Sequence, residues 1–292
     1  MENKSIKVNF LMNAFLTMSS FIFPLLTFPY ISRVLLPEGT GKISFANSFI
    51  QYFILFAGLG IPTYGVRACA KVRDDKEKLS RTVHELLSIN LIMCVAAYII
   101  LFVILEFVDQ FHGDRELYLV YSILIFLNAV GMEWLYKSLE LYSYITIRSI
   151  IFKLISVILM FLLVKSEDDY VIYGMISVLS SGGSYLCNFY NARKYISWKP
   201  QQHYHLKRHM KAIFTFFAMS CATTIYTNLD TVMLGFMKTD ADVGYYNASI
   251  KIKSVLLSLV TSLGTVLLPR TSYYVEHNLT EKLYDICKKS FN

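Results

Sequence analysis

The residues of this sequence that could do chemistry are charged side chains within long apolar runs, because a charge in a bilayer is costly and is kept there for a reason. Lys251 and Lys253 lie in the apolar run 243–269. If this run enters the bilayer as a helix at Val243, the rise per residue places them roughly 12 and 15 Å deep. Their spacing turns them about 200° apart, so only one can face a cavity. They predict contact with an anionic ligand. The alternatives are a buried structural pair, or a helix that begins later and leaves both at the interface.

Asp230 and Arg33 are two further charged candidates, one within an apolar run and the other at the end of one. Asp230 lies some 10 Å from the outer end of the apolar run 211–237, by the same rise per residue. It could pair with Lys251, take up a proton or form a structural salt bridge. Arg33 ends the first apolar run. It fits either an outer gate or an anchor at the interface.

A second group of charges surrounds the fifth apolar run, 147–164. Arg148 and Lys153 fall inside it or at its edge, and both are candidates to line a cavity. Snorkelling of these long side chains to the inner surface is the favoured alternative. Glu133 and Glu140, in the preceding segment, could balance the positive charge.

Three prolines interrupt the first two apolar runs and are candidate hinges: Pro24, Pro29 and Pro62. Proline removes a helical hydrogen bond and kinks the helix. Membrane helices also tolerate proline without any gating role. The small-residue run from Ser180 to Ser184 favours close helix packing over ligand binding.

Motifs for metal, redox or nucleotide chemistry are weak or missing. His203, His205 and His209 lie close together, but with no Cys, Asp or Glu beside them they favour a solvated basic loop over a metal site. The five cysteines show no paired spacing, so we expect no zinc site and no disulfide framework. We find no Walker loop, GxSxG or HExxH motif, so the sequence predicts neither an enzyme nor a bound cofactor.

The elements that must position these residues are membrane-spanning helices. The 292 residues are 55% apolar and only 17% charged, below the roughly 25% charge of a soluble domain. About 20 apolar residues suffice to cross a bilayer as a helix. The sequence predicts an all-α polytopic membrane protein with about eight transmembrane helices, at 8–32, 43–66, 85–107, 117–137, 147–164, 170–192, 211–237 and 243–269.

The basic residues indicate the orientation of these spans. With the N-terminus in the cytoplasm, the inner segments hold 21 Lys and Arg and the outer loops hold 5. This asymmetry follows the positive-inside rule. The net charge of +7 therefore reflects membrane topology, and no nucleic-acid partner is expected. We predict a multi-pass protein of the inner, or plasma, membrane whose N-terminus is cytoplasmic.

A faint internal repeat predicts the domain organisation. Val34-Leu35-Leu36 is followed by Gly41, and Val232-Met233-Leu234 is followed by Gly244. Spans seven and eight would then repeat spans one and two. The predicted parts are a six-helix lobe at 1–192, a cytoplasmic linker at 193–210, and a partial second lobe at 211–292 with two spans and the lead-in to a third. On this interpretation the sequence is a fragment or a truncated product.

Several of these segments together resemble a known family of transporters. They are PLLTFPYISRVLLPEGTGKISFANSFIQYF (24–53), GIPTYGVRACAKVRDDKEKLSRT (60–82), IYTNLDTVMLGF (225–236) and VGYYNASIKIK (243–253). The pattern is similar to the Wzx-type polysaccharide flippases, which serve O-antigen and capsule export, of the multidrug/oligosaccharidyl-lipid/polysaccharide exporter superfamily. The resemblance covers essentially the whole chain.

The resemblance implies two lobes of six helices and transport by alternating access. The expected substrate is an undecaprenyl-pyrophosphate-linked oligosaccharide, which Lys251 would contact at its pyrophosphate. Membrane lipids and a polysaccharide polymerase of the same pathway are the expected partners. The alternatives are an exporter of another substrate in the superfamily, a membrane-embedded enzyme of the same pathway or, as a weaker third, a channel. Outer loops of about ten residues or fewer argue against the enzyme.

Overall fold

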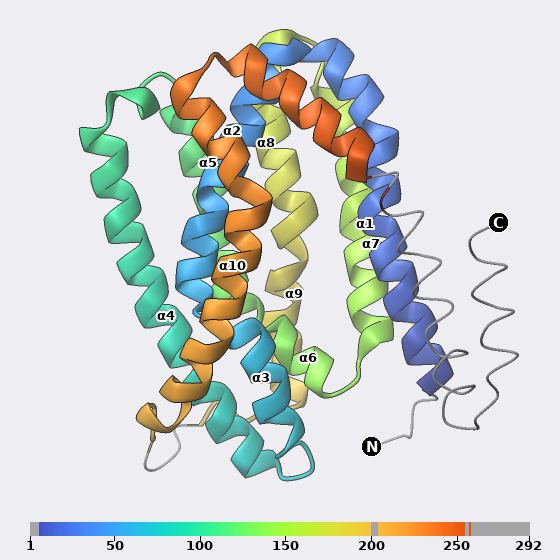
Figure 1. Ribbon diagram of the computed structural model, residues 1–292. Coiled ribbons are helices and arrows are strands. Elements are labelled where there is room, and N and C mark those ends of the chain that lie inside the picture. The colour runs from blue at the N-terminus through green and yellow to red at the C-terminus, as the bar shows by residue number, and fades with distance from the viewer. Residues whose placement is uncertain (1–5, 200–203, 255–256, 258–292) are drawn as a thin grey trace, which may run out of the picture. The chain divides into compact units, whose positions relative to one another are not determined.

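The computed structural model describes residues 6–199, 204–254 and 257, and its regular structure there is helical. The chain divides into two compact units, Met1–Tyr246 and Asn247–Asn292. Within the first unit the long helices run up and down beside one another (Figure 1). The predicted all-α membrane fold is confirmed.

Ten α-helices of the first unit position the side chains discussed below. They are α1 (Ile6–Val34), α2 (Leu36–Gly58), α3 (Ile61–Ala70), α4 (Lys76–Phe107), α5 (Arg115–Gly131), α6 (Glu133–Ser138), α7 (Tyr142–Leu163), α8 (Tyr170–Val178), α9 (Ser184–Asn191) and α10 (Lys207–Met237). A π-helix at Leu179–Gly183 joins α8 to α9. Residues 240–246 are also helical, and the helical assignment continues to residue 254 in the second unit.

Six stretches of the described chain are long and apolar enough to cross a membrane: Leu11–Val34, Leu36–Ala70, Lys76–Phe107, Arg115–Ser138, Tyr142–Leu163 and Lys207–Met237. They correspond to predicted spans one to five and seven. The predicted sixth span, 170–192, is built as α8, the π-helix and α9 in succession. The predicted eighth span lies largely outside the described residues.

Two of these spans are broken near one end of the bundle. Between α2 and α3, Leu59 and Gly60 take left-handed backbone angles, with φ of 43° and 76°. Between α5 and α6, Met132 does the same, with φ of 41°. The sequence predicts that Pro62 interrupts a helix, but the structure places it in the first turn of α3. A proline in a first turn costs no hydrogen bond. The helices α3 and α6 then pack together, with Gly65 against the ring of Trp134.

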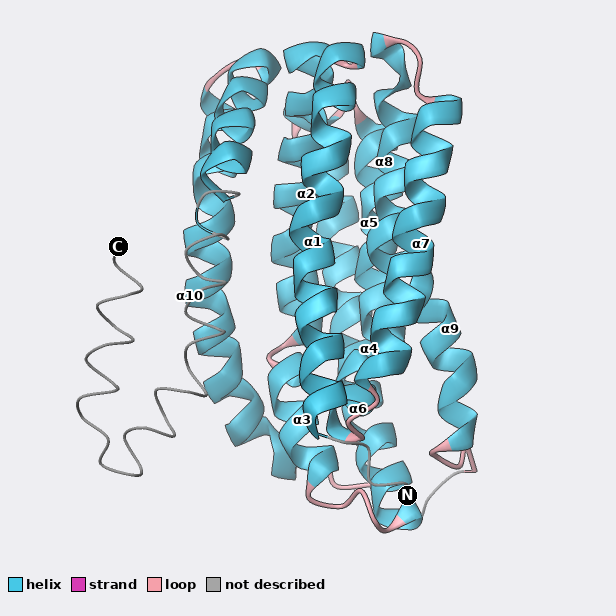
Figure 2. Cartoon of the chain, turned by 90° about the vertical axis from the view of Figure 1, so that its right-hand side faces the viewer, coloured by secondary structure: helices cyan, strands magenta, loops and turns pink. Residues whose placement is uncertain are grey.

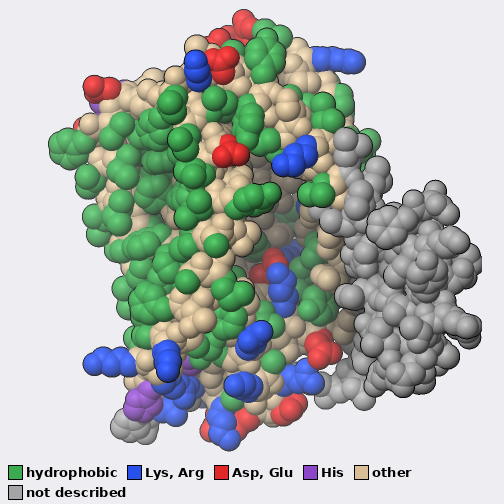
Figure 3. All heavy atoms as spheres, viewed as in Figure 1, with side chains coloured by type: hydrophobic (Ala, Val, Ile, Leu, Met, Phe, Trp, Pro, Cys, Tyr) green, Lys and Arg blue, Asp and Glu red, His purple; other side chains and the backbone are tan. Residues whose placement is uncertain are grey.

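The end of the bundle that carries α3 and α6 is also its basic end. Figure 3 shows Lys, Arg and His side chains gathered there on the face in view, while apolar side chains cover the middle. Exposed apolar side chains on α4, such as Ile92, Val95 and Ile99, suit a surface in contact with lipid. Figure 2 shows α3 and α6 at this same end from a second direction.

Helix α10 lies along α2 and is joined to it by close backbone contacts. Near the basic end, a side chain on Gly60 would overlap the backbone of α10. At the opposite end, a Cβ on Gly41 would overlap the carbonyl of Asp240, and a Cβ on Gly244 would overlap the carbonyl of Pro37. These are the two glycines that the predicted repeat equates, and each permits the close approach of the other segment.

The orientation of the bundle can be tested by cysteine labelling. In a variant without the five native cysteines, we expect Asp74→Cys and Lys199→Cys to react only from the cytoplasmic side. Gly113→Cys and Asp168→Cys should react from outside, because their loops lie at the end that is poor in basic residues. The measurement is labelling of intact cells with a membrane-impermeant maleimide. Labelling of position 74 from outside would reverse the topology.

Candidate functional site

The structure brings three of the charged residues near the fifth predicted span into one cluster. Glu133, in the first turn of α6, lies 2.8 Å from the Nζ of Lys137 and 3.6 Å from the Nη2 of Arg148 on α7. The cluster thus holds two cations and one carboxylate. Glu140, the other acidic residue singled out in the sequence, pairs instead with Arg73 at 2.7 Å.

Arg148 is the most buried cation of this cluster. Its side chain is 6% exposed, and among the described residues its Nε and Nη1 have no hydrogen-bond partner. The guanidinium lies over the rings of Tyr144 and Tyr185, 5.6 and 5.8 Å from their centres. Cation–π contact offsets part of its desolvation but leaves the N–H donors unused. Arg148 therefore does not snorkel to the inner surface, contrary to the favoured interpretation of the sequence.

Lys153 also remains within the bundle but faces a different helix. Its Nζ lies 2.9 and 3.0 Å from the hydroxyls of Ser19 and Ser20 on α1, and 5.9 Å from the centre of the Phe23 ring. Five residues separate it from Arg148, which is about 7.5 Å along the helix and about 140° around it. The two cations therefore cannot hold the same small anion.

The molecule is hollowed on the face seen in Figure 3, and acidic and basic side chains are visible within the hollow. A recess of this kind between helices is where bundles place polar ligands. In lipid surroundings, a polar or charged wall requires water, a ligand or a partner side chain. The recess is thus the candidate site for a polar cargo.

The other predicted site residues are not brought into this cluster. Asp230 accepts a hydrogen bond from the hydroxyl of Tyr246 at 2.8 Å. Arg33 is exposed in the last turn of α1. Lys251 and Lys253 belong to the second unit, so the pairing of Lys251 with Asp230 and its contact with substrate stay predictions.

Both prolines of the first span lie within one continuous helix. Pro24 and Pro29 are inside α1, and both are exposed. A hinge at either one stays a prediction. The small-residue run of the sixth span does permit close packing, as expected: Gly182 lies against Leu124 and Leu127 of α5.

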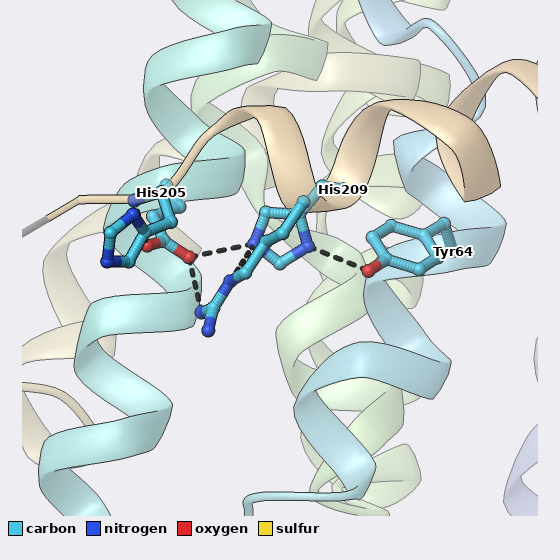
Figure 4. A network of polar contacts seen from close by, with 5 residues as sticks. Tyr64, His205 and His209 are labelled. Carbon is cyan, nitrogen blue, oxygen red and sulfur yellow. Dashed lines mark hydrogen bonds and ion pairs between the residues drawn. The ribbon is translucent and has the colours of Figure 1, made fainter.

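A second polar cluster, which the sequence did not predict, joins the start of α10 to α3 and α4 (Figure 4). Its centre is the carboxylate of Glu85 on α4, whose side chain is 0% exposed. Glu85 accepts hydrogen bonds from the backbone N–H of His205 at 2.7 Å and from the Nη2 of Arg208 at 2.5 Å. Its Oε2 also lies 2.8 Å from the Nε2 of His209.

His209 extends this cluster to α3. Its Nδ1 lies 2.7 Å from the hydroxyl of Tyr64 (Figure 4). The Nε of Arg208 also lies 3.2 Å from the Nε2 of His209, so this ring nitrogen lies between the guanidinium and the carboxylate. The sequence suggested a solvated loop for this histidine. That interpretation is wrong for His209, which is 4% exposed, whereas His205 is exposed and His203 lies outside the described residues.

A third cluster lies at the opposite end of the bundle. The Nζ of Lys42 on α2 lies 3.2 Å from Asp114, which also accepts a hydrogen bond from the hydroxyl of Tyr170 at 2.9 Å. Burial raises the pKa of Asp240 nearby; Lys42 opposes this rise, and the carboxylates of Asp114 and Glu38 add to it. One lysine thus faces several carboxylates where the segment after α10 meets α2.

Comparison with known proteins adds the family. The family model described as "Polysaccharide biosynthesis protein" matches residues 6–275. This chain belongs to the polysaccharide biosynthesis protein family.

Two curated relatives of this chain carry the same printed name. The chain is 25% identical over 270 residues to the "Putative O-antigen transporter" of Escherichia coli (strain K12), a match that covers 92% of this chain and 65% of that protein. It is 25% identical over 268 residues to the "Putative O-antigen transporter" of Shigella dysenteriae, covering 91% and 67%. The chain therefore spans about two thirds of the length of these relatives. No solved structure matches it.

The sequence does not identify Glu85 and Tyr64 as site residues, because their partners are distant along the chain. Glu85 lies at the first residue of a predicted span, 120 or more residues before its partners. An acidic residue at the edge of an apolar run, facing a basic segment with several histidines, was the available signal. Tyr64 gave none, because tyrosine is common at span ends for interfacial reasons.

The Glu85 cluster predicts a ranking of stabilities for this member of the polysaccharide biosynthesis protein family. Glu85→Gln should lower the free energy of unfolding by about 3 kcal/mol, because it removes the buried charge that the imidazole of His209 and the guanidinium of Arg208 both contact. Arg208→Gln should cost about 1 kcal/mol, since this guanidinium is 46% exposed and screened by water. The measurement is denaturant unfolding in detergent, together with protease cleavage within residues 193–211.

Arg73→Gln is the matched control for this comparison. It removes an ion pair at the same end of the bundle, in which Arg73 and Glu140 are both well exposed. We expect an unchanged unfolding midpoint. Equal stability of Glu85→Gln and the unmodified chain would show that the Glu85 carboxylate is not needed to hold α10.

Proposed function

We propose that this chain takes part in moving lipid-linked oligosaccharide units across the inner membrane for polysaccharide export, with its N-terminus in the cytoplasm. The observation that carries the proposal is the buried Arg148, whose Nε and Nη1 lack partners among the described residues. Family membership and two relatives named for O-antigen transport support the direction of the proposal.

The chemistry of Arg148 suits the linkage group of such a substrate. An undecaprenyl carrier holds its sugars through a pyrophosphate, which is anionic and must lose hydration as it crosses the membrane. A guanidinium donates two parallel hydrogen bonds to a phosphate and is less strongly hydrated than an ammonium. With Lys137 beside Glu133, the cluster retains net positive charge after its internal pairing. Tyr144 and Tyr185 supply aromatic faces beside it.

The fold supports a transport step without covalent chemistry. Spans broken at Gly60 and Met132 place irregular, buried backbone near one end of the bundle, and transporters use irregular backbone where a span borders a cavity. Rocking of two lobes about such a site would expose it alternately to each leaflet. We expect no enzymatic activity and no cofactor for this step. A polymerase of the same pathway is the expected recipient of the transported unit.

An exporter of another substrate in the superfamily is the alternative that shares this geometry. A drug exporter would not require the sugar-linked carrier, and disruption of its gene would leave surface polysaccharide intact. A membrane-embedded enzyme of the pathway would still permit transfer of the carrier lipid between leaflets. The three functions can therefore be told apart by the lipid-linked intermediate that accumulates when the chain is inactive.

Arg148 provides the direct test of the proposed function. With its native locus otherwise intact, Arg148→Ala should reduce surface polysaccharide by about 10- to 100-fold, because charge-assisted hydrogen bonds to phosphate contribute about 1.5–3 kcal/mol. Arg148→Lys should retain part of the export, since it keeps the charge without the bidentate geometry. The measurements are surface polysaccharide, protein level in the membrane, and lipid-linked intermediates in the cytoplasmic leaflet.

Arg115→Ala is the control, because Arg115 pairs with Glu106 at the opposite end of the bundle and is well exposed. Its export should equal that of the unmodified chain. Normal export by Arg148→Ala at normal protein level would exclude the proposed role of this guanidinium.

Lys251 supports a separate prediction from the sequence. An ammonium near the bilayer midplane costs about 2.5–3.5 kcal/mol on insertion scales, so it is kept where a cavity or an anion compensates it. We expect Lys251→Ala to abolish export without lowering protein level, and Lys251→Arg to keep partial function because the charge remains. Lys253→Ala, on the other side of the helix, is the comparison. Export by Lys251→Ala at the normal level would favour the interfacial interpretation.

A further inference from the structure

A groove of about 670 Å³ lies on the surface where α7 begins and α9 ends, and none of the Glu85 cluster lines it. Its walls come from the first turn of α7, the last two turns of α9 and the short helix Ala192–Lys194. The lining residues are Tyr144, Leu186, Cys187, Tyr190, Asn191, Arg193 and Lys194. The groove thus combines apolar and aromatic side chains with two cations, and no acidic residue lines it.

The two cations of this groove are exposed and not neutralised within the described chain. Arg193 lies over the ring of Tyr190, 4.9 Å from its centre, and neither Arg193 nor Lys194 has an ion pair among the described residues. Other basic residues at the same end do pair with carboxylates: Arg73 with Glu140, Lys78 with Asp75, and Lys137 with Glu133. The groove therefore presents uncompensated positive charge to an anion.

An apolar stripe leads away from the groove along α7. Ile147, Ile151, Leu154 and Ile158 are 49 to 59% exposed, and they follow Tyr144 at helical spacing on one face. From Ile147 to Ile158 the helix rises about 17 Å. That is close to the depth of one leaflet, since the hydrocarbon core is about 30 Å thick. The stripe can therefore cover one extended acyl chain.

We infer that this groove binds an anionic phospholipid, with its phosphate beside Arg193 and Lys194 and one acyl chain along the stripe on α7. Basic pockets between membrane helices on the cytoplasmic side recognise such headgroups, while Tyr and Arg side chains suit the interface. The lipid would border the proposed substrate site, because the ring of Tyr144 lines the groove and also contacts Arg148. This site does not depend on the identity of the transported substrate.

The experiment compares lipid retention by the purified chain and a charge variant. The detergent-solubilised protein is titrated with phosphatidylglycerol or phosphatidylcholine, and bound lipid is counted by native mass spectrometry. The unmodified chain should hold one phosphatidylglycerol more tightly than phosphatidylcholine. The double variant Arg193→Gln/Lys194→Gln should lose most of this preference, at about fivefold for each charge removed.

Two further variants separate this site from general surface charge. Lys71→Gln/Lys76→Gln removes the same charge from the end of α3 and the start of α4, where both residues are exposed, and should keep the preference. Leu186→Trp fills the groove without altering charge and should weaken binding of both lipids. An equal loss in the Lys71/Lys76 variant would overturn the proposal, as would the same affinity for both lipids in the unmodified chain.

Inorganic phosphate distinguishes a lipid site from a site for soluble anions. Added at millimolar concentration, it should not displace phosphatidylglycerol, because it cannot contact the apolar stripe. Displacement by phosphate alone, with no contribution from the acyl chain, would likewise overturn the lipid assignment.

Discussion

The cost of removing charge from water governs the arrangement of ionisable groups in this bundle. Inside lipid, a charged side chain must find an opposite charge, hydrogen-bond partners or a wet cavity. Glu85 has all the partners that a buried carboxylate needs: its side chain is 0% exposed and contacts three groups of residues 205–209, where α10 begins. Since α4 belongs to the N-terminal spans, this one carboxylate fixes where the predicted second lobe begins.

Arg148 is also buried, but only part of its guanidinium has partners. It has one carboxylate at 3.6 Å and two aromatic rings, yet Nε and Nη1 lack partners in the described part of the chain. In a purely structural cluster these unpaired donors would destabilise the fold, because a buried donor without an acceptor costs free energy. A ligand or water within hydrogen-bond distance of this guanidinium would supply the missing partners. The contrast with Glu85 separates a group that holds helices together from one suited to a passing ligand.

The helix breaks meet the corresponding constraint on the backbone. A span interrupted at Gly60 or Met132 leaves carbonyl and N–H groups without helical partners, and lipid cannot satisfy them. In this chain the side chain of Asn188 on α9 donates to the carbonyl of Gly131 at 2.7 Å, and Tyr136 donates to the carbonyl of Asn188 at 2.5 Å. The break between α5 and α6 is therefore held by one residue of the sixth predicted span, Asn188, through its side chain and its backbone carbonyl.

The sequence alone predicts where most of the long helices lie, but it does not predict which polar side chains contact one another. Hydropathy and charge counts follow from local composition, so the helices of the first seven predicted spans were predicted, although not the π-helix in the sixth. Contacts depend on which helices become neighbours. The sequence predicts an interruption at Pro62 because a proline is visible there. The actual break at Gly60 depends on backbone angles that allow α10 to approach, and these are not visible in the sequence.

Close approach at Gly60 and at the Gly41–Gly244 pair also limits how α10 can move. At both ends its segment touches backbone rather than side chains, so rotamer changes cannot make room for sliding. Near the basic end the Glu85 cluster adds charge-assisted hydrogen bonds, whereas at the opposite end Asp240 lies among other carboxylates with Lys42 as the opposing cation. The second contact is electrostatically the weaker one. A motion of α10 against α2 would therefore begin by separating Gly41 from Gly244, with the start of α10 as its fixed point.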